Sequence, residues 1–209
     1  MKRAKLNLVT RFYRMLFLSS IGASPLQSCA ASPAIKIDDL KLIRVEIVQQ
    51  EWIPKQDRFW DDGVITAPLF KITFRSKFNL EVLARTEHYN IDNVTSLCRN
   101  STIDQSSRLR GFPSVFDSVG RIDEFRAMTK PGNNTIREDG FEYHVYFDIR
   151  QSGIRGFYSY DLVHQSADVC ITVNGTQEIA FGIANRFTSN TLLVPKEMIS
   201  AATAEAGVR

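Results

Sequence analysis

The sequence has few of the features that mark specialised protein classes. Its 209 residues include only three Cys, seven Pro and eleven Gly. So few cysteines exclude a small disulfide-dense scaffold, and the low Pro and Gly content excludes collagen-like and low-complexity chains. Apolar residues make up 44% and charged residues 23% of the chain, which is typical of a globular protein. The length suits one domain, or at most two small ones.

The start of the chain has no acidic residue. Residues 1–28 contain five Lys or Arg residues and no Asp or Glu. Residues 29–209 therefore hold 21 of the 26 basic residues and all 23 acidic ones, so the formal charge of +3 for the whole chain becomes −2 for this part. A basic stretch followed by a short apolar run at 15–23 is typical of a secretory signal, and that run is far shorter than the roughly 20 residues that cross a bilayer. We therefore expect residues 1–28 to be a signal peptide.

The end of this segment resembles the lipobox of bacterial lipoprotein precursors. Leu26, Ser28 and Cys29 match its pattern of Leu, small residues and Cys, and the resemblance covers only the first 30 residues. It implies cleavage before Cys29 and a lipid anchor on that residue, which makes the membrane a partner. Two or three acyl chains anchor durably, since each buried CH₂ contributes about 0.8 kcal/mol. Because Ala30 stands where an Asp often retains lipoproteins at the inner membrane, the resemblance implies the periplasmic face of the outer membrane.

Two other fates of the segment remain open. The run Ser28-Cys29-Ala30 also fits the small-x-small site of an ordinary signal peptidase, which would discard Cys29 and release a soluble periplasmic or secreted protein. The segment can also be an uncleaved anchor. In the lipoprotein interpretation, residues 29–39, which are rich in Ala, Ser and Pro, form a short tether to a single domain at 40–209.

Two cysteines remain after Cys29. An even pair in an exported chain favours a disulfide between Cys98 and Cys170, because such compartments are oxidising. The bridge would close about 70 residues, for which chain entropy predicts a stabilisation of roughly 4 kcal/mol. The alternatives are two separate thiols, or a reactive thiolate at Cys98 beside the positive charge of Arg99.

The rest of the chain alternates apolar and polar residues with the period of two that is typical of strands. The alternating segments are 41–48, 70–75, 78–82, 142–150, 169–173, 179–184 and 192–194. In the first of them, Ile43, Val45 and Ile47 are expected to share one face. Asn174-Gly175 is a favoured hairpin turn after the fifth.

Helical periodicity is weak by comparison. It predicts one short helix near 118–130 and a short C-terminal helix at 196–204, with Pro195 in its first turn. The polar segments 99–118 and 131–140 are expected to be loops. Seven or eight short strands over about 170 residues predict an all-β, immunoglobulin-like β-sandwich.

Both Trp residues lie in one charged segment. Trp52, Phe59, Trp60 and Asp61 fall between 49 and 63 and form the candidate binding loop, because Trp on a loop with charges is common at recognition surfaces. The alternative is that Trp52 and Phe59 cap the core.

Motifs that would carry catalysis, metal or cofactor binding are scarce. The segment around Asp61 lacks the EF-hand spacing for calcium, and the three His residues lack zinc-ligand spacing. Nucleotide-binding and Gly-x-Ser-x-Gly signatures are absent. His164 lies two residues from Ser166, so a dispersed Ser/His/Asp triad stays an alternative. We expect no metal, no cofactor and, since residues 29–209 are mildly acidic, no nucleic-acid partner.

The sequence therefore predicts an envelope lipoprotein whose β-sandwich is a non-enzymatic binding or structural module, with an envelope protein or glycan as its partner. Enzymatic activity stays open. The alternatives are an exported hydrolase with dispersed active-site residues, and a subunit of an envelope or secretion assembly that pairs through an edge strand.

Overall fold

The computed structural model describes residues 35–49, 68–118, 120–122, 139–152, 159–179 and 182–208. They all belong to the second of the chain's two compact units, Ala34–Arg209. The described part of this unit is mostly antiparallel β-structure and holds two helices and ten strands, where seven or eight strands were expected. No helix among these residues is long and apolar enough to span a bilayer.

The smaller of the two main sheets has three strands. Its order is β1 (Lys41–Val48), β2 (Leu69–Ser76), β5 (Phe141–Asp148), and all pairs are antiparallel. The strands predicted at 70–75 and 142–150 are confirmed as β2 and β5, and Phe70, Ile72 and Phe74 are fully buried. The polar face is not exposed as expected, because Thr73, His144 and Tyr146 are buried as well.

β1 departs from its predicted alternation at one residue. A β-bulge shifts the register, so that Leu42 lies opposite Phe74 and Arg44 lies opposite Thr73. Ile43 is the extra residue, and 42% of its surface is exposed. The expectation that Ile43 shares a buried face with Val45 was therefore wrong, because an inserted residue moves the preceding side chains to the other face.

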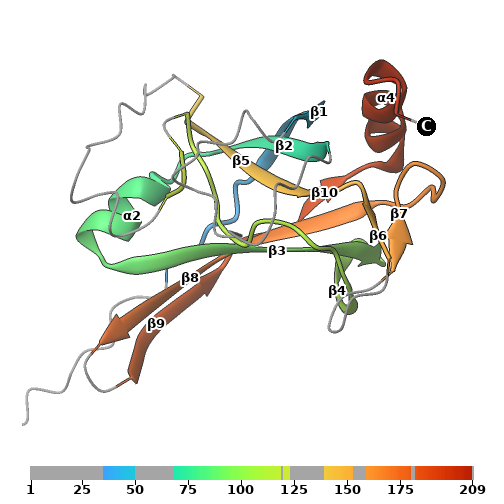
Figure 1. Cartoon of the computed structure of the whole chain (residues 1–209). Helices are drawn as coiled ribbons and strands as arrows, with labels where there is room; N and C mark the ends of the chain where they lie inside the picture. The colour runs from blue at the N-terminus through green and yellow to red at the C-terminus, as the bar shows by residue number, and fades with distance from the viewer. Residues whose placement is uncertain are drawn as a thin grey trace, which may run out of the picture. The chain divides into compact units, whose positions relative to one another are not determined.

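The larger sheet has five strands, and β8 lies at its centre. The order is β10 (Leu192–Val194), β8 (Val169–Ile179), β3 (Tyr89–Arg99), β4 (Thr102–Arg108), and β9 (Gly182–Thr188) pairs with the second half of β8. β10 and β9 thus follow each other along the same edge of β8 (Figure 1). A separate pair of two-residue strands, β6 (Arg150–Gln151) and β7 (Tyr160–Asp161), follows β5.

The predicted hairpin turn at Asn174-Gly175 was wrong, because β8 continues through it. Asn174 pairs with Asp92 on one side and Thr188 on the other, and Gly175 lies opposite Phe187. A Cβ atom on Gly175 would overlap the ring of Phe187. The glycine here makes room for an aromatic ring instead of making a turn.

The segment predicted as a strand at 78–82 starts a helix. α2 (Leu80–Thr86) begins at Asn79, whose side chain accepts a hydrogen bond from the Val82 N–H at 3.1 Å. The phenol of Tyr143 accepts the Leu80 N–H at 2.9 Å and donates to the Phe78 carbonyl at 2.9 Å. A short run cannot distinguish a strand from a buried helical turn by periodicity alone, and these caps decide in favour of the helix.

Two further predictions concern the remaining helices and loops. The C-terminal helix is confirmed as α4 (Lys196–Glu205), with Pro195 as its N-cap. Residues 99–118 are not simply a loop, because they contain β4. The helix expected near 118–130 lies almost wholly outside the described residues; Ser118 and 120–122, which are described, are not helical.

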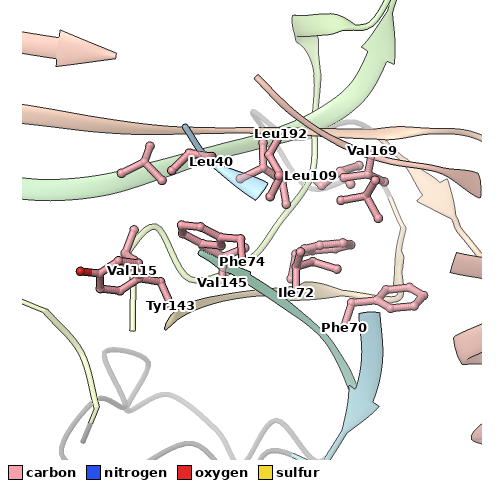
Figure 2. Packing of buried hydrophobic residues seen from close by; sticks show 14 of the residues in the cluster. Leu40, Phe70, Ile72, Phe74, Leu109, Val115, Tyr143, Val145, Val169 and Leu192 are labelled. Carbon is pink, nitrogen blue, oxygen red and sulfur yellow. The ribbon is translucent and has the colours of Figure 1, made fainter. Parts of the chain in front are cut away.

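The core lies between the two sheets. One apolar cluster combines Phe70, Ile72 and Val145 of the smaller sheet with Val169 and Leu192 of the larger one. Figure 2 shows these side chains between the strands, with Leu109 entering from the segment after β4. A smaller cluster holds the edge-to-face rings of Phe112, Phe116 and Tyr146.

Candidate functional site

Most of the predicted site residues lie outside the described residues. This is the case for the predicted lipid anchor Cys29 and for the predicted binding loop of Trp52, Phe59, Trp60 and Asp61. Their roles stay predictions.

The predicted disulfide is present. Cys98 at the end of β3 and Cys170 near the start of β8 are bonded, with Cα atoms 5.0 Å apart and a sequence separation of 72. Cys170 is fully buried. Because β3 and β8 are neighbours in one sheet, the bond joins adjacent strands of the larger sheet and does not cross the core.

A hollow of about 130 Å³ lies where the chain leaves β4 and crosses toward β5. The crossing is fixed from both sheets: Leu109 N–H donates to the Thr95 carbonyl at 2.9 Å, and Phe112 N–H donates to the Tyr146 carbonyl at 3.0 Å. Gly111 permits this route, because a Cβ atom there would overlap the Tyr146 carbonyl oxygen. The lining residues are Asn93, Thr95, Arg108, Leu109, Gly111, Phe112 and Pro113.

Asn93 is the buried polar residue that holds this crossing in place. Its side-chain N–H groups donate to the carbonyls of Phe112 at 2.8 Å and Ser114 at 2.9 Å, and its Oδ1 accepts the Thr95 hydroxyl at 3.0 Å. A buried amide with this many partners is rigid. Asn93 and Thr95 therefore form a fixed polar lining, while Arg108 is exposed.

Asp92 precedes the lining residue Asn93 in the sequence and lies opposite Asn174 of the neighbouring strand β8. Burial raises the pKa of its carboxyl group, and the hydrogen bond from Asn174 and the positive charge of Arg108 oppose that rise. Its Oδ1 atom is buried without a hydrogen-bond partner. Asp92, Arg108 and Asn174 thus place a partly desolvated carboxylate, a cation and an amide on adjacent strands. Of these three residues only Arg108 also lines the hollow.

His144 is buried and hydrogen-bonded. Its Nδ1 lies 3.1 Å from the Thr73 hydroxyl, and only 8% of the residue is exposed. Burial is the main reason that its pKa falls to about 4, and the charge of Lys71 adds to this. His144 is consequently neutral at neutral pH.

His164 makes a contact that resembles part of a catalytic triad. Its Nδ1 lies 2.8 Å from Asp161 Oδ2, and Arg150 Nε contacts the other carboxylate oxygen at 3.2 Å. A carboxylate on Nδ1 is how triads orient their imidazole. Among the described hydrogen bonds, however, none joins a serine hydroxyl to His164, so the structure does not bring Ser166 and His164 into a triad.

Within the described ranges, no group of three or more His, Cys, Asp or Glu side chains is placed to hold a metal ion. The chain matches no family model, and comparison with curated proteins and with solved structures also found no match. The site is therefore interpreted from its own geometry.

Sequence reasoning missed the hollow. The signal was present in β3, where Asn93 and Thr95 stand at the alternate positions that continue the buried face of Ile91. Polar residues on a core-facing stripe require hydrogen-bond partners. The partners, Phe112 and Ser114, lie in a segment that was expected to be only a loop.

Proposed function

We propose that this protein is an exported lipoprotein whose β-sandwich is a binding module of the cell envelope. The anchor would be Cys29, and the sandwich would be held by a short tether. The observation that carries the proposal is the Cys98–Cys170 disulfide. Structural disulfides persist in oxidising compartments and are rare in the cytosol, so the bond supports the export that residues 1–28 predict.

We further infer that the sandwich is immunoglobulin-like. In that fold, strands A, B, E and D form one sheet and G, F, C and C′ the other. The observed order β1-β2-β5 corresponds to A-B-E, and β10-β8-β3-β4 corresponds to G-F-C-C′. The isolated bridges from Gly111 to Phe147 and from Phe116 to His144 put residues 111–116 beside β5, at the D position. The departure is the disulfide, since immunoglobulin domains join B to F between the sheets.

Binding is the activity that the described geometry favours. The hollow by Asn93 and Arg108 offers a rigid polar lining and an exposed cation. Both N–H groups of the Asn93 amide already donate within the protein, so the guanidinium of Arg108 is the group that would bind a small anionic group on an envelope glycan or protein.

The anchor is tested with a Cys29→Ala variant expressed in a bacterium with lipoprotein processing enzymes. The natural chain is expected to fractionate with membranes and to carry a diacylglyceryl and acyl mass on Cys29. Cys29→Ala is expected to lose that mass and to leave the membrane fraction. Fractionation and intact mass spectrometry measure both effects.

A matched control is Ser28→Ala, which keeps a small residue before the cysteine and should mature normally. A Cys29→Ala protein that matures normally and stays membrane-bound contradicts the lipid anchor. Soluble wild-type protein that begins after residue 29 supports ordinary signal peptidase cleavage instead.

A further inference from the structure

The first described residues are bound to both sheets. Asp39 accepts hydrogen bonds from the Ser76 hydroxyl at 2.8 Å and from the Lys77 N–H at 2.6 Å, both at the end of β2. The side chain of Asn190, between β9 and β10, accepts the Leu40 N–H at 3.0 Å and donates to the Leu40 carbonyl at 3.3 Å. We call residues 37–40 the N-terminal clamp.

The clamp is reinforced by burial and by a backbone bond. Asn190 N–H donates to the Ile37 carbonyl at 2.8 Å, and Ile37 and Leu40 are buried in the core. The chain is thus fixed to the domain from Ile37 onward, so Ile37 is the point at which the preceding segment is attached to the domain.

The clamp marks one end of the sandwich. Lys41 pairs with Arg75, and Ser76 pairs with Phe141, so β1 and β5 begin where β2 ends. α2 follows β2 at this end, and Gln177 of β8 donates a hydrogen bond to the Glu87 carbonyl after α2 at 2.7 Å. Figure 1 shows α2 and the β8–β9 hairpin on the same side of the domain.

The opposite end carries different elements. β1 ends at Val48, opposite the start of β2 at Leu69, which pairs with Asp148 at the end of β5. α4 packs against β1, and Lys196 N–H at its start donates to Asp168 Oδ1, just before β8, at 2.9 Å. Figure 1 shows α4 and the C-terminus on the side away from α2.

We propose that the end carrying α2 and the β8–β9 hairpin faces the lipid surface, and that the end carrying α4 points away from it. This rests on the proposed anchor at Cys29. Seven residues lie between Cys29 and Ile37, and the eight Cα–Cα steps from one to the other span about 28 Å at full extension. The eight residues of β2 span a further ~26 Å. The α2 end therefore cannot move farther than about one tether length from the bilayer, whereas the far end can lie up to roughly twice that distance away.

Resonance energy transfer to the bilayer tests this orientation. Dye is attached to Val82→Cys on α2 or to Ala204→Cys on α4, two exposed positions. The lipidated protein is placed in phosphatidylglycerol–phosphatidylethanolamine vesicles that contain a headgroup-labelled acceptor. We use a donor–acceptor pair with a Förster radius of ~40 Å. The energy-transfer efficiency from position 82 is expected to exceed that from position 204 by at least about twofold. Arg85→Cys on α2 and Glu205→Cys on α4 are a second pair of exposed labelling sites. They give the same comparison if a variant of the first pair does not fold.

A lengthened tether is the control. Twenty Gly and Ser residues inserted after Pro33 let the domain rotate freely, so the difference between positions 82 and 204 is expected to shrink toward zero. Equal or reversed transfer in membrane-bound, lipidated protein with the natural tether overturns the orientation alone. A protein without lipid mass that does not bind the vesicles overturns the anchor and the orientation with it.

Discussion

At the scale of single residues, His144 is the side chain whose behaviour differs most from its sequence context. The sequence places it on the polar face of a strand, yet it is buried against Thr73. The charged groups around it are Lys71 and Arg44, which lower its pKa, and Glu142 and Glu46, which raise it. Burial and the two cations together outweigh the two glutamates, so the native state holds the neutral imidazole.

This burial predicts a pH-dependent stability. The pKa of His144 is about 4 in the folded protein, where the ordinary value is 6.5, so the unfolded chain binds more protons between these values. The contribution is complete above pH 6.5 and is lost as the pH falls toward 4, by up to ~3 kcal/mol. Urea unfolding at pH 7, 6, 5 and 4.5 measures the loss.

His144→Gln is the matched comparison, because a neutral amide also hydrogen-bonds Thr73 and does not titrate. We expect the stability of this variant to fall less steeply between pH 6.5 and 4. Parallel pH profiles for the two proteins would contradict a depressed histidine pKa.

At the scale of elements, packing against partners overrode local patterns in three places. A bulge in β1 exposed Ile43, a cap at Asn79 made a helix of a predicted strand, and β8 ran through a favoured turn dipeptide. In each case the local pattern was compatible with two structures, and contacts from residues far along the chain selected one. Strands with uninterrupted alternation, such as β2 and β5, were predicted correctly because burial on the core face leaves a single register.

The close approach of the Phe187 ring to Gly175 can be tested by substitution. Gly175→Ala is expected to destabilise the domain by about 1–3 kcal/mol, since the new methyl overlaps the Phe187 ring in a packed site. Chemical denaturation of the single variant, of Phe187→Ala and of the double variant forms a double-mutant cycle. The penalty of the Ala at 175 should largely vanish when Phe187 is removed; an undiminished penalty would place its origin in the backbone of β8.

At the scale of the whole molecule, the disulfide joins the central pair of the larger sheet. Cys98 and Cys170 are 72 residues apart, and all of the chain from β4 to β7 lies between them. The bond therefore restricts a large loop of the unfolded chain. The two sheets share one core, so a loss at this bond acts on the domain as a unit.

Removing the bond with Cys98→Ala and Cys170→Ala together is expected to reduce the free energy of unfolding by about 2–4 kcal/mol. Thermal unfolding with and without dithiothreitol measures the effect. The natural protein should lose stability on reduction, whereas the double variant should not respond. A natural protein that keeps its Tm after complete reduction of the bond would contradict this stabilising role.

The sequence by itself determined the β-rich class, the cysteine pair, the best strands and the helix after Pro195. These follow from short-range physics and from counting: a period of two, the fixed backbone angle of proline and the two cysteines that remain beyond Cys29. Only the tertiary structure decided the bulge at Ile43, the continuation of β8 at Gly175, the hollow around Asn93 and the binding of the N-terminal clamp (residues 37–40) to both sheets. Their hydrogen bonds and ring contacts join residues that are far apart in the chain, and local patterns carry no information about such partners.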